Sequence, residues 1–462
     1  MMFFRFFLSL TPVCLVGWMV LSFVLSRESS FSLAERGALS FGMGWGVLTL
    51  EMFYFSLLGL PWNFFLLFSP WFILLPFSLW KRRGDERHLF NSKRTPWSSL
   101  ERTLILFLLL VFLHTCVESL TFPLTHYDFW DAWSIWGLKA KAFTISRAID
   151  FSFFSDPSKY YAHQEYPLLL PLSETWIYLV LGRIDEQIIK LLFPLFYLSF
   201  LILFGGAFRR EHGRMASLLL TTFLATLPIF LEYTLQGYAE LHVTFYYTLS
   251  TLYLYFWCQK GGKEDLWVGI FFSTFAAWTK NEGQALFVIN ALFFGMARFF
   301  TSSRPVRKKA LEWLLLFLPA LFLLPWWLLL KQLKVPSEFL AQLKVEALLE
   351  RSWRFPVILN TFFRKVLDLS KWNLLWIGFF LFGSFSWKKN FSFSKAALTL
   401  VLLFHLVLYI FIYMIHPLDV LWAMNVDDSF NRILLHAAPV ALFLLGSFLS
   451  MEGPKTSEAK KK

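Results

Sequence analysis

The sequence predicts an all-α polytopic membrane protein with about 12–14 transmembrane segments. Hydrophobic residues make up 57% of the 462 residues and charged residues only 16%, whereas a soluble domain carries about 25% charged residues. Apolar runs of about 20 residues, the length of a helix that crosses a bilayer, follow one another along the chain. No alternation typical of a membrane β-barrel is visible, so the spanning elements are expected to be helices.

The apolar runs give the expected segments in order. The long runs lie near 6–26, 39–60, 62–80, 103–122, 186–208, 214–235, 238–257, 311–330, 396–415 and 433–450. Shorter or interrupted runs lie at 166–182, 266–279, 284–300 and 372–386. Between 166 and 208 two apolar segments fall where the alternation of sides needs one crossing. The number of crossings there and the side of the N-terminus therefore stay open.

The net charge of +12 comes from 43 Lys and Arg against 31 Asp and Glu. Most basic residues lie in short loops, and the positive-inside rule places such loops in the cytoplasm. The strongest of them are 81–102, 209–214, 298–309 and 460–462. The opposite side then holds 123–166, 236–240, 280–283, 331–371 and 416–432. The basic surplus therefore indicates membrane topology rather than nucleic acid binding.

Two long stretches on the expected outer side have amphipathic patterns. Trp130, Trp133 and Trp136 recur at helical spacing within 129–143. Residues 337–367 mix apolar with basic residues, as in Leu340, Leu343 and Leu348 beside Lys344, Arg351 and Arg354. We expect both stretches to be helices that lie in the membrane interface.

The first polar cluster on this side follows a span directly, at 126–141. Asp128 and Asp131 are three residues apart and share a helix face, and Lys139 and Lys141 follow them. A solvated interfacial loop explains the segment as well as a functional role does. In the functional interpretation, one carboxylate is a general base that accepts the proton of an attacking hydroxyl.

Four further clusters on the same side are short. In order along the chain, they contain His163, Glu165 and Tyr166; Glu240; Lys280 and Glu282; and Arg432 with His436. Each has a structural alternative: a proline-set helix entry, a helix cap, a turn, or an arginine that snorkels to headgroups. A lysine on the outer side runs against the usual charge bias, however, and a guanidinium binds phosphate in bidentate fashion. Together, the five clusters indicate a site for an anionic lipid-linked substrate and a hydroxyl acceptor.

The order of these motifs resembles the GT-C type of multi-span glycosyltransferase, the superfamily of the dolichyl-phosphate-mannose protein mannosyltransferases. The motifs are WDAWSIW followed by KAK, HQEYPLLLP, GYAE, TKNEG, and D-x-x-W with S-x-x-R-x-x-x-H-x-x-P. The likeness covers about 103–445 and is closest to bacterial enzymes that use polyprenyl-phosphate sugars. It implies a GT-C-like fold, with Asp131 as the catalytic base and Asp128 as the second choice.

The resemblance also implies roles for the remaining residues. Lys280, Arg432 and His436 match positions expected to handle the donor phosphate. Glu165 holds the acidic place before Tyr-Pro, whereas Glu240 stands where relatives more often have Asp. The complete expected substrate-binding set is His163, Glu165, Tyr166, Glu240, Lys280, Glu282, Arg432, His436, Lys139 and Lys141.

The expected activity is transfer of a monosaccharide from a polyprenyl-phosphate donor to a lipid, glycan or protein, with inversion. It would take place at the outer, periplasmic face of a bacterial inner membrane. No metal site is predicted, although a divalent ion is an open alternative as cofactor. The expected parts are N-terminal segments with a basic loop (1–102), a GT-C-like transmembrane catalytic region (103–450) and a basic cytoplasmic tail (451–462).

Three alternatives remain. A transporter or flippase of lipid-linked sugars also places charges among spans, but its polar residues gather near the bilayer midplane and its halves usually repeat. An O-antigen polymerase or ligase would use an oligosaccharide-diphosphate donor. A scaffold subunit would have no catalytic residues at all.

Overall fold

The computed structural model describes residues 1–26, 29–82, 96–121, 129–336, 344–386, 392–417 and 422–449. All regular elements of this part are helices, which confirms the all-α prediction for these residues. Eight of the described helices are long and apolar enough to cross a membrane. They are Met2–Val24, Phe64–Lys81, Ser99–Thr121, Ile188–Ala225, Asn281–Thr301, Val306–Gln332, Phe393–Ile415 and Trp422–Leu449. The described chain is therefore a polytopic helical membrane protein, and the larger number of crossings stays a prediction.

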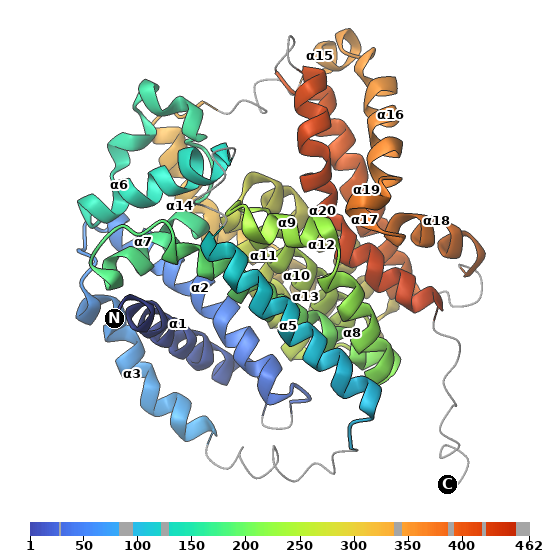
Figure 1. The fold of residues 1–462 in the computed structure, drawn as a ribbon, viewed down its shortest axis with the longest axis horizontal. Helices are drawn as coiled ribbons and strands as arrows, with labels where there is room; N and C mark the ends of the chain where they lie inside the picture. Colours follow the sequence, from blue (N-terminus) through green and yellow to red (C-terminus); the bar gives the residue numbers. More distant parts are fainter. Residues whose placement is uncertain are drawn as a thin grey trace.

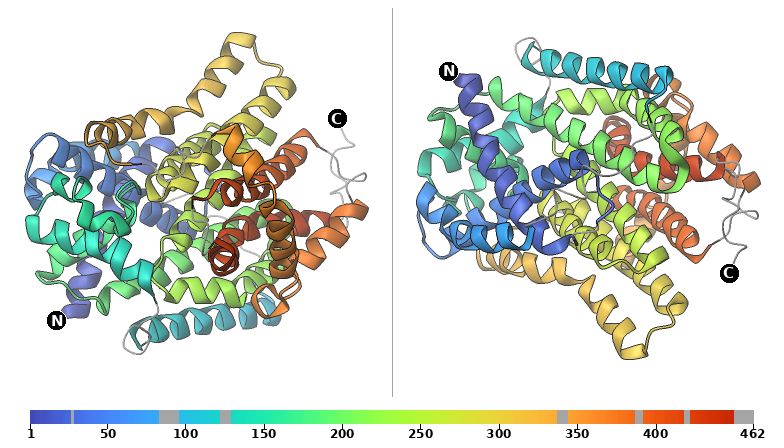
Figure 2. Two further views of the ribbon diagram at one scale, coloured as in Figure 1. Left: turned by 90° about the horizontal axis from the view of Figure 1, so that it is seen from above. Right: turned by 90° about the horizontal axis from the view of Figure 1, so that it is seen from below.

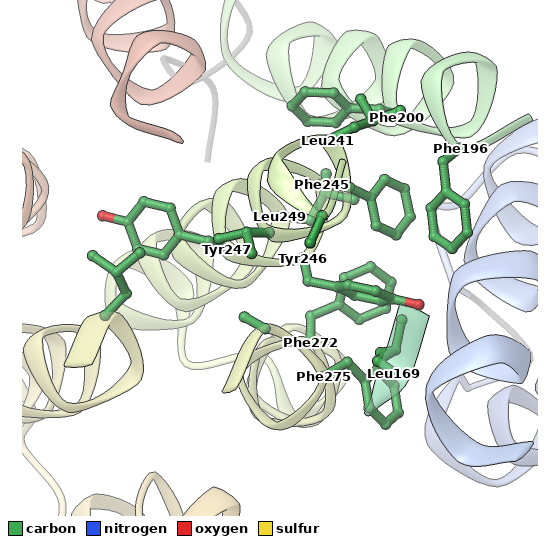
Figure 3. Packing of buried hydrophobic residues seen from close by; sticks show 14 of the residues in the cluster. Leu169, Phe196, Phe200, Leu241, Phe245, Tyr246, Tyr247, Leu249, Phe272 and Phe275 are labelled. Atoms are coloured by element: carbon green, nitrogen blue, oxygen red, sulfur yellow. The ribbon is translucent and has the colours of Figure 1, made fainter. Parts of the chain in front are cut away.

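The helix α10 (Glu240–Lys260) forms the centre of the molecule. Every residue from Glu240 to Cys258 is buried, so this helix needs no apolar surface for lipid. It packs against α8 (Leu192–Ala225), α11 (Lys263–Thr279), α12 (Asn281–Thr301) and α20 (Trp422–Leu449). Figure 3 shows Phe245 and Tyr246 of α10 among the aromatic rings of α8 and α11, and the Phe245 and Phe272 ring centroids are 5.6 Å apart. Such aromatic pairs add to the burial of apolar area.

Two glycines allow α1 (Met2–Val24) and α2 (Leu33–Leu57) to cross at short range. A Cβ at Gly17 would lie 1.8 Å from the Ser40 carbonyl oxygen, and one at Gly44 would lie 1.9 Å from that of Val13. Small residues at such crossings are typical of helix pairs in membranes, because dispersion contacts replace the hydrophobic effect there.

The structure revises the segments expected between 166 and 235. The helix α7 (Leu169–Leu181) has 13 residues, fewer than the about 20 that a bilayer needs. α7 is thus the short segment of this region. The break expected at 209–214 is present, because the non-helical backbone at Gly213 (φ 79°, ψ 178°) divides α8 into two helices. The expected run 214–235 is divided again, since α9 (Pro228–Leu235) begins anew at a proline.

The expected interfacial helix at 129–143 is only partly correct. The structure has a π-helix at Ala132–Gly137, followed by α6 (Leu138–Ser146). Trp130 and Trp133 are 51% and 47% exposed, but Trp136 is fully buried. The wider π-turn explains this difference, because a three-residue spacing no longer keeps one face.

The expectation of an interfacial helix at 337–367 is also only partly correct. Leu340 and Leu343 lie outside the described residues, and α15 (Val345–Glu350) and α16 (Arg354–Val366) follow. Arg354 is fully buried and its Nη1 donates to the His416 carbonyl oxygen at 2.6 Å. Arg354 was expected at a lipid surface, but it binds the C-terminal end of α19 (Phe393–Ile415), where helix carbonyls attract cations.

The helices have two distinct ends. In Figure 1, α6 and α15 lie at one end, whereas the end of α3 (Phe64–Arg82) and the beginning of α5 (Ser99–Thr121) lie at the other. The two stretches with amphipathic patterns therefore share one end of the molecule. The helix α13 (Val306–Leu315), which precedes α14 (Leu318–Gln332) in the sequence, has no buried residue. Figure 2 shows that it projects away from the other helices.

Candidate functional site

A sharp reversal between α11 and α12 brings the TKNEG motif to the centre of the site. Lys280 alone separates the two helices, in an extended conformation with φ −158° and ψ 158°. A Cβ at Gly283 would lie 1.9 Å from the Ala276 carbonyl oxygen, so only glycine permits this approach. The reversal places Lys280 and Glu282 beside Glu240, the first residue of α10.

Five charged residues form one continuous ion-pair network. Arg432 Nη1 lies 2.7 Å from Asp131 Oδ2, and Arg432 Nε lies 3.8 Å from Glu240 Oε1. Lys280 Nζ lies 2.8 Å from Glu240 Oε1 and 2.9 Å from Glu282 Oε1. Three carboxylates thus alternate with two cations, and these residues come from four separate motifs of the sequence.

The inner part of this network is strongly buried. The side chains of Glu240 and Lys280 are 1% and 5% exposed. Burial alone would lower the pKa of Lys280, but the carboxylates of Glu240 and Glu282 outweigh it and raise this pKa. Lys280 therefore carries its charge at neutral pH.

The HQEYP loop is held by an aromatic stack and a buried lysine. The Tyr166 ring lies between Trp136, with centroids 5.6 Å apart, and His163, at 4.7 Å. Lys139 Nζ donates to the His163 carbonyl oxygen at 2.6 Å, and His163 has a positive φ of 47°. Burial lowers the pKa of Lys139 to about 7, although the negative charge of Glu165 acts in the opposite direction. Lys139 thus stabilises the conformation of the loop by a hydrogen bond to its backbone.

A cavity of about 860 Å³ opens in front of the charged network. Its polar lining comes from the HQEYP loop and from the facing parts of α12, α14, α19 and α20: His163, Glu165, Tyr166, Asn281, Glu282, Gln284, Lys331, Tyr409, Tyr413, His416, Asn425, Ser429 and Arg432. The apolar lining lies along α12, α14 and α19, with Val335 just after α14 and Ile433 in α20: Phe287, Val288, Trp327, Leu330, Val335, Leu408, Phe411, Ile412 and Ile433 among others. Val288 and Phe411 are about one-third exposed, which places part of the apolar lining at the protein surface. The cavity therefore joins a charged end to an apolar wall.

The expected residues take different places around this cavity. His163, Glu165, Tyr166, Glu282 and Arg432 line it. Asp131, Glu240 and Lys280 contact that lining through ion pairs. His436 accepts or donates a hydrogen bond of 2.7 Å with the lining residue Tyr409. Asp128 lies outside the described residues.

Lys141 does not join this site, contrary to expectation. It pairs with Glu186 on the other side of the π-helix and α6. Residues that are two positions apart in a helix lie about 200° apart around its axis, so Lys139 and Lys141 face opposite sides. Membership of one motif therefore did not mean membership of one site.

Two tyrosines of α19 were missed by the sequence analysis. Tyr409 and Tyr413 line the cavity, and Tyr413 Oη lies 2.8 Å from Ser429 Oγ. His405, Tyr409 and Tyr413 recur every fourth residue within an apolar helix. That spacing places three polar groups on one face and was the available signal.

Among the residues with described positions, no group of three or more His, Cys, Asp or Glu side chains could hold a metal ion. The fold and the site define a polytopic helical membrane protein with a charged network at one end of an apolar cavity. Comparisons with protein family models, with curated proteins and with solved structures find no match to this chain. The residues of the site therefore carry the functional argument.

Proposed function

We propose that this protein is a GT-C-type membrane glycosyltransferase that moves a monosaccharide from a polyprenyl-phosphate donor to a hydroxyl acceptor. The acceptor is a lipid, glycan or protein at the outer face of a bacterial inner membrane. The observation that carries this proposal is the cavity of about 860 Å³ that has Arg432 at its charged end and apolar side chains along α12, α14 and α19.

The two ends of the cavity suit the two parts of such a donor. The polyprenyl chain packs against Phe287, Leu408 and Ile412, which favours the burial of hydrocarbon. The phosphate binds Arg432, whose Nη1 and Nε contact Asp131 and Glu240. Among the described residues, its Nη2 donates no hydrogen bond to a carboxylate, which leaves this nitrogen to donate to the phosphate.

Asp131 is the base in this proposal. It accepts the proton of the acceptor hydroxyl, whose oxygen forms a bond to the anomeric carbon of the donor sugar. The bond from that carbon to the phosphate oxygen breaks, and polyprenyl phosphate leaves with the bonding electrons. Attack opposite to the leaving group inverts the anomeric centre, and a phosphate needs no proton to leave at neutral pH.

The other charged residues support this step without touching the sugar. Arg432 stabilises the negative charge that develops on the phosphate. The Lys280 side chain is 5% exposed, whereas that of Asp131 is 24% exposed, so Lys280 acts through Glu240 and Glu282 rather than by direct contact. This differs from the expectation that Lys280 itself meets the phosphate.

A transfer assay in nanodiscs tests the proposal and separates it from a flippase. Purified protein is incubated with polyprenyl-phosphate hexose that carries a radiolabel in the sugar, together with a membrane extract as the source of acceptors. We expect the label to leave the donor and polyprenyl phosphate to accumulate. A donor that stays intact while it crosses the bilayer of sealed vesicles would contradict transfer and favour a flippase.

A further inference from the structure

A second cavity, of about 390 Å³, lies on the other side of the π-helix that follows Asp131. Its lining comes from the π-helix region, α6, α7 and the segment just before α8: Phe129, Ala132, Trp133, Gly137, Lys141, Glu174, Tyr178, Glu186, Ile189 and Lys190. The volume is within the range of small-molecule sites, about 300–1,000 Å³. The proposed function uses none of these residues.

The π-helix lines the second cavity, and the residue before it, Asp131, pairs with a residue that lines the first. Asp131 reaches Arg432 in the first cavity, whereas the next two residues, Ala132 and Trp133, line the second. Single π-turns occur often at functional sites, because they aim neighbouring side chains in directions that an α-helix does not allow. A ligand in the second cavity therefore lies next to the residue that the proposed function assigns as the base.

One oxygen of a buried acidic side chain in this cavity lacks a hydrogen-bond partner among the described residues. Glu174 is 5% exposed, and its Oε2 has no hydrogen-bond partner among the described residues. A buried polar atom without a hydrogen-bond partner destabilises the folded protein. Tyr178 lies one turn further along α7 and lines the same cavity. The position of Glu174 therefore calls for a ligand that forms a hydrogen bond with Oε2, such as a hydroxyl, which can both donate and accept.

The remaining lining narrows the chemistry of this ligand. Two lysines and two glutamates balance each other, and Lys141 already pairs with Glu186, so the cavity has no surplus charge for a phosphate. Phe129, Trp133 and Tyr178 supply aromatic rings. Aromatic faces together with donors and acceptors suit a pyranose, which has apolar C–H faces and a rim of hydroxyls.

We propose that this second cavity binds a neutral sugar ring of the acceptor and that the acceptor is therefore a glycan or glycolipid. This inference rests on the proposed function for its role in transfer. A ring hydroxyl donates to Glu174, the ring stacks on Trp133, and a further hydroxyl reaches around the π-helix to Asp131. That hydroxyl gives its proton to Asp131 while its oxygen bonds to the donor's anomeric carbon and the phosphate leaves.

Saturation-transfer NMR with three neutral probes tests the inference without the donor. The probes are methyl α-D-glucopyranoside, methyl α-D-mannopyranoside and methyl α-D-galactopyranoside, added to the full-length protein in nanodiscs. We expect transfer to at least one probe for the wild type. We expect a loss of about tenfold or more in the affinity for that probe, measured by titration, in both Glu174→Gln and Trp133→Ala. Trp133 is half exposed, so its replacement leaves the core intact even if Glu174→Gln fails to fold.

One variant serves as the control in this experiment. Glu232→Gln changes a carboxylate that pairs with Lys371 outside both cavities, and it should bind the probe like the wild type. No saturation transfer to any probe, or equal transfer to the Trp133→Ala variant, would overturn the inference. Probe binding that depends on Trp133, in a protein that fails the transfer assay, would support the sugar site and reject the glycosyltransferase.

Discussion

Arg432 and Asp131, which are 301 positions apart in the sequence, form an ion pair of 2.7 Å at the charged end of the large cavity. The pair joins the π-helix region to α20. It orients the carboxylate of Asp131 and the guanidinium of Arg432 with respect to each other. In the proposed reaction these are the group that accepts the proton and the group that holds the phosphate.

Arg432→Lys tests the geometry of phosphate binding. Lysine keeps the charge but loses the planar fork, so it cannot contact Asp131, Glu240 and a phosphate at once. We expect kcat/KM for the donor to fall by about 10–100-fold, equivalent to about 1.4–2.8 kcal/mol of transition-state stabilisation. Arg364→Lys, at an exposed arginine that pairs with Asp427, is the matched control and should retain full activity. Equal activity of both variants would reject the role of Arg432.

Lys280→Met tests the buried part of the ion-pair network. The substitution leaves Glu240 and Glu282 buried without their cation, which costs about 3–5 kcal/mol in the free energy of unfolding. Thermal unfolding of the purified protein in detergent measures this loss. Combining Lys280→Met with Glu240→Gln should recover part of it. Normal stability with loss of donor binding would instead indicate that Lys280 contacts the phosphate directly.

Lys139 predicts a specific dependence of stability on pH. Its pKa in the folded protein is lowered from 10.5 to about 7, so between these values the unfolded chain binds the proton more strongly. Stability therefore rises with pH from about 7 to about 10.5, and below this window the buried charge has its full cost. Lys139→Met should remove this rise. Unfolding midpoints at pH 6 to 9 that stay parallel in the two proteins would contradict the assignment.

Gly283→Ala tests the reversal between α11 and α12. The new Cβ would meet the Ala276 carbonyl oxygen at 1.9 Å, so the helices must separate and Lys280 must move. We expect a loss of about 1–3 kcal/mol in stability, as for other overpacked sites, together with reduced transfer. Gly37→Ala is the control, because a Cβ there meets nothing within 4 Å. Equal unfolding midpoints of the two variants would show that the reversal tolerates a side chain.

The sequence predicts the helices well because each apolar run must satisfy its backbone hydrogen bonds internally in lipid. It also identifies the members of the ion-pair network. Charged residues are rare in such a chain, and because they are costly to place within a membrane, they indicate functional positions. The pairing of Arg432 with Asp131 was not predictable, because it depends on how distant helices pack. Two placements differ from expectation for a local reason. Lys141 lies away from the ion-pair network, and Arg354 is buried against a helix end, because neither rotation around a helix nor burial is visible in composition.

The second cavity could also not be predicted from the sequence. Its residues come from four segments, and neither Glu174 nor Tyr178 belongs to a motif. Glu174 lies within the apolar run 166–182, and a single carboxylate there does not change the assignment of the run as an apolar helix. Its lack of a partner for Oε2 became visible only with the packing of α7.

The rate of sugar transfer by Asp131→Asn is the most direct test of the central claim. With saturating labelled donor, we predict a rate about 10²–10⁴-fold below that of the wild type, the usual contribution of a general base. Asp156→Asn is the matched control, because Asp156 lies in the same segment between α5 and α7, caps a short helix and lines neither cavity described here. It should transfer sugar at the wild-type rate. A rate for Asp131→Asn equal to that of Asp156→Asn would contradict the account.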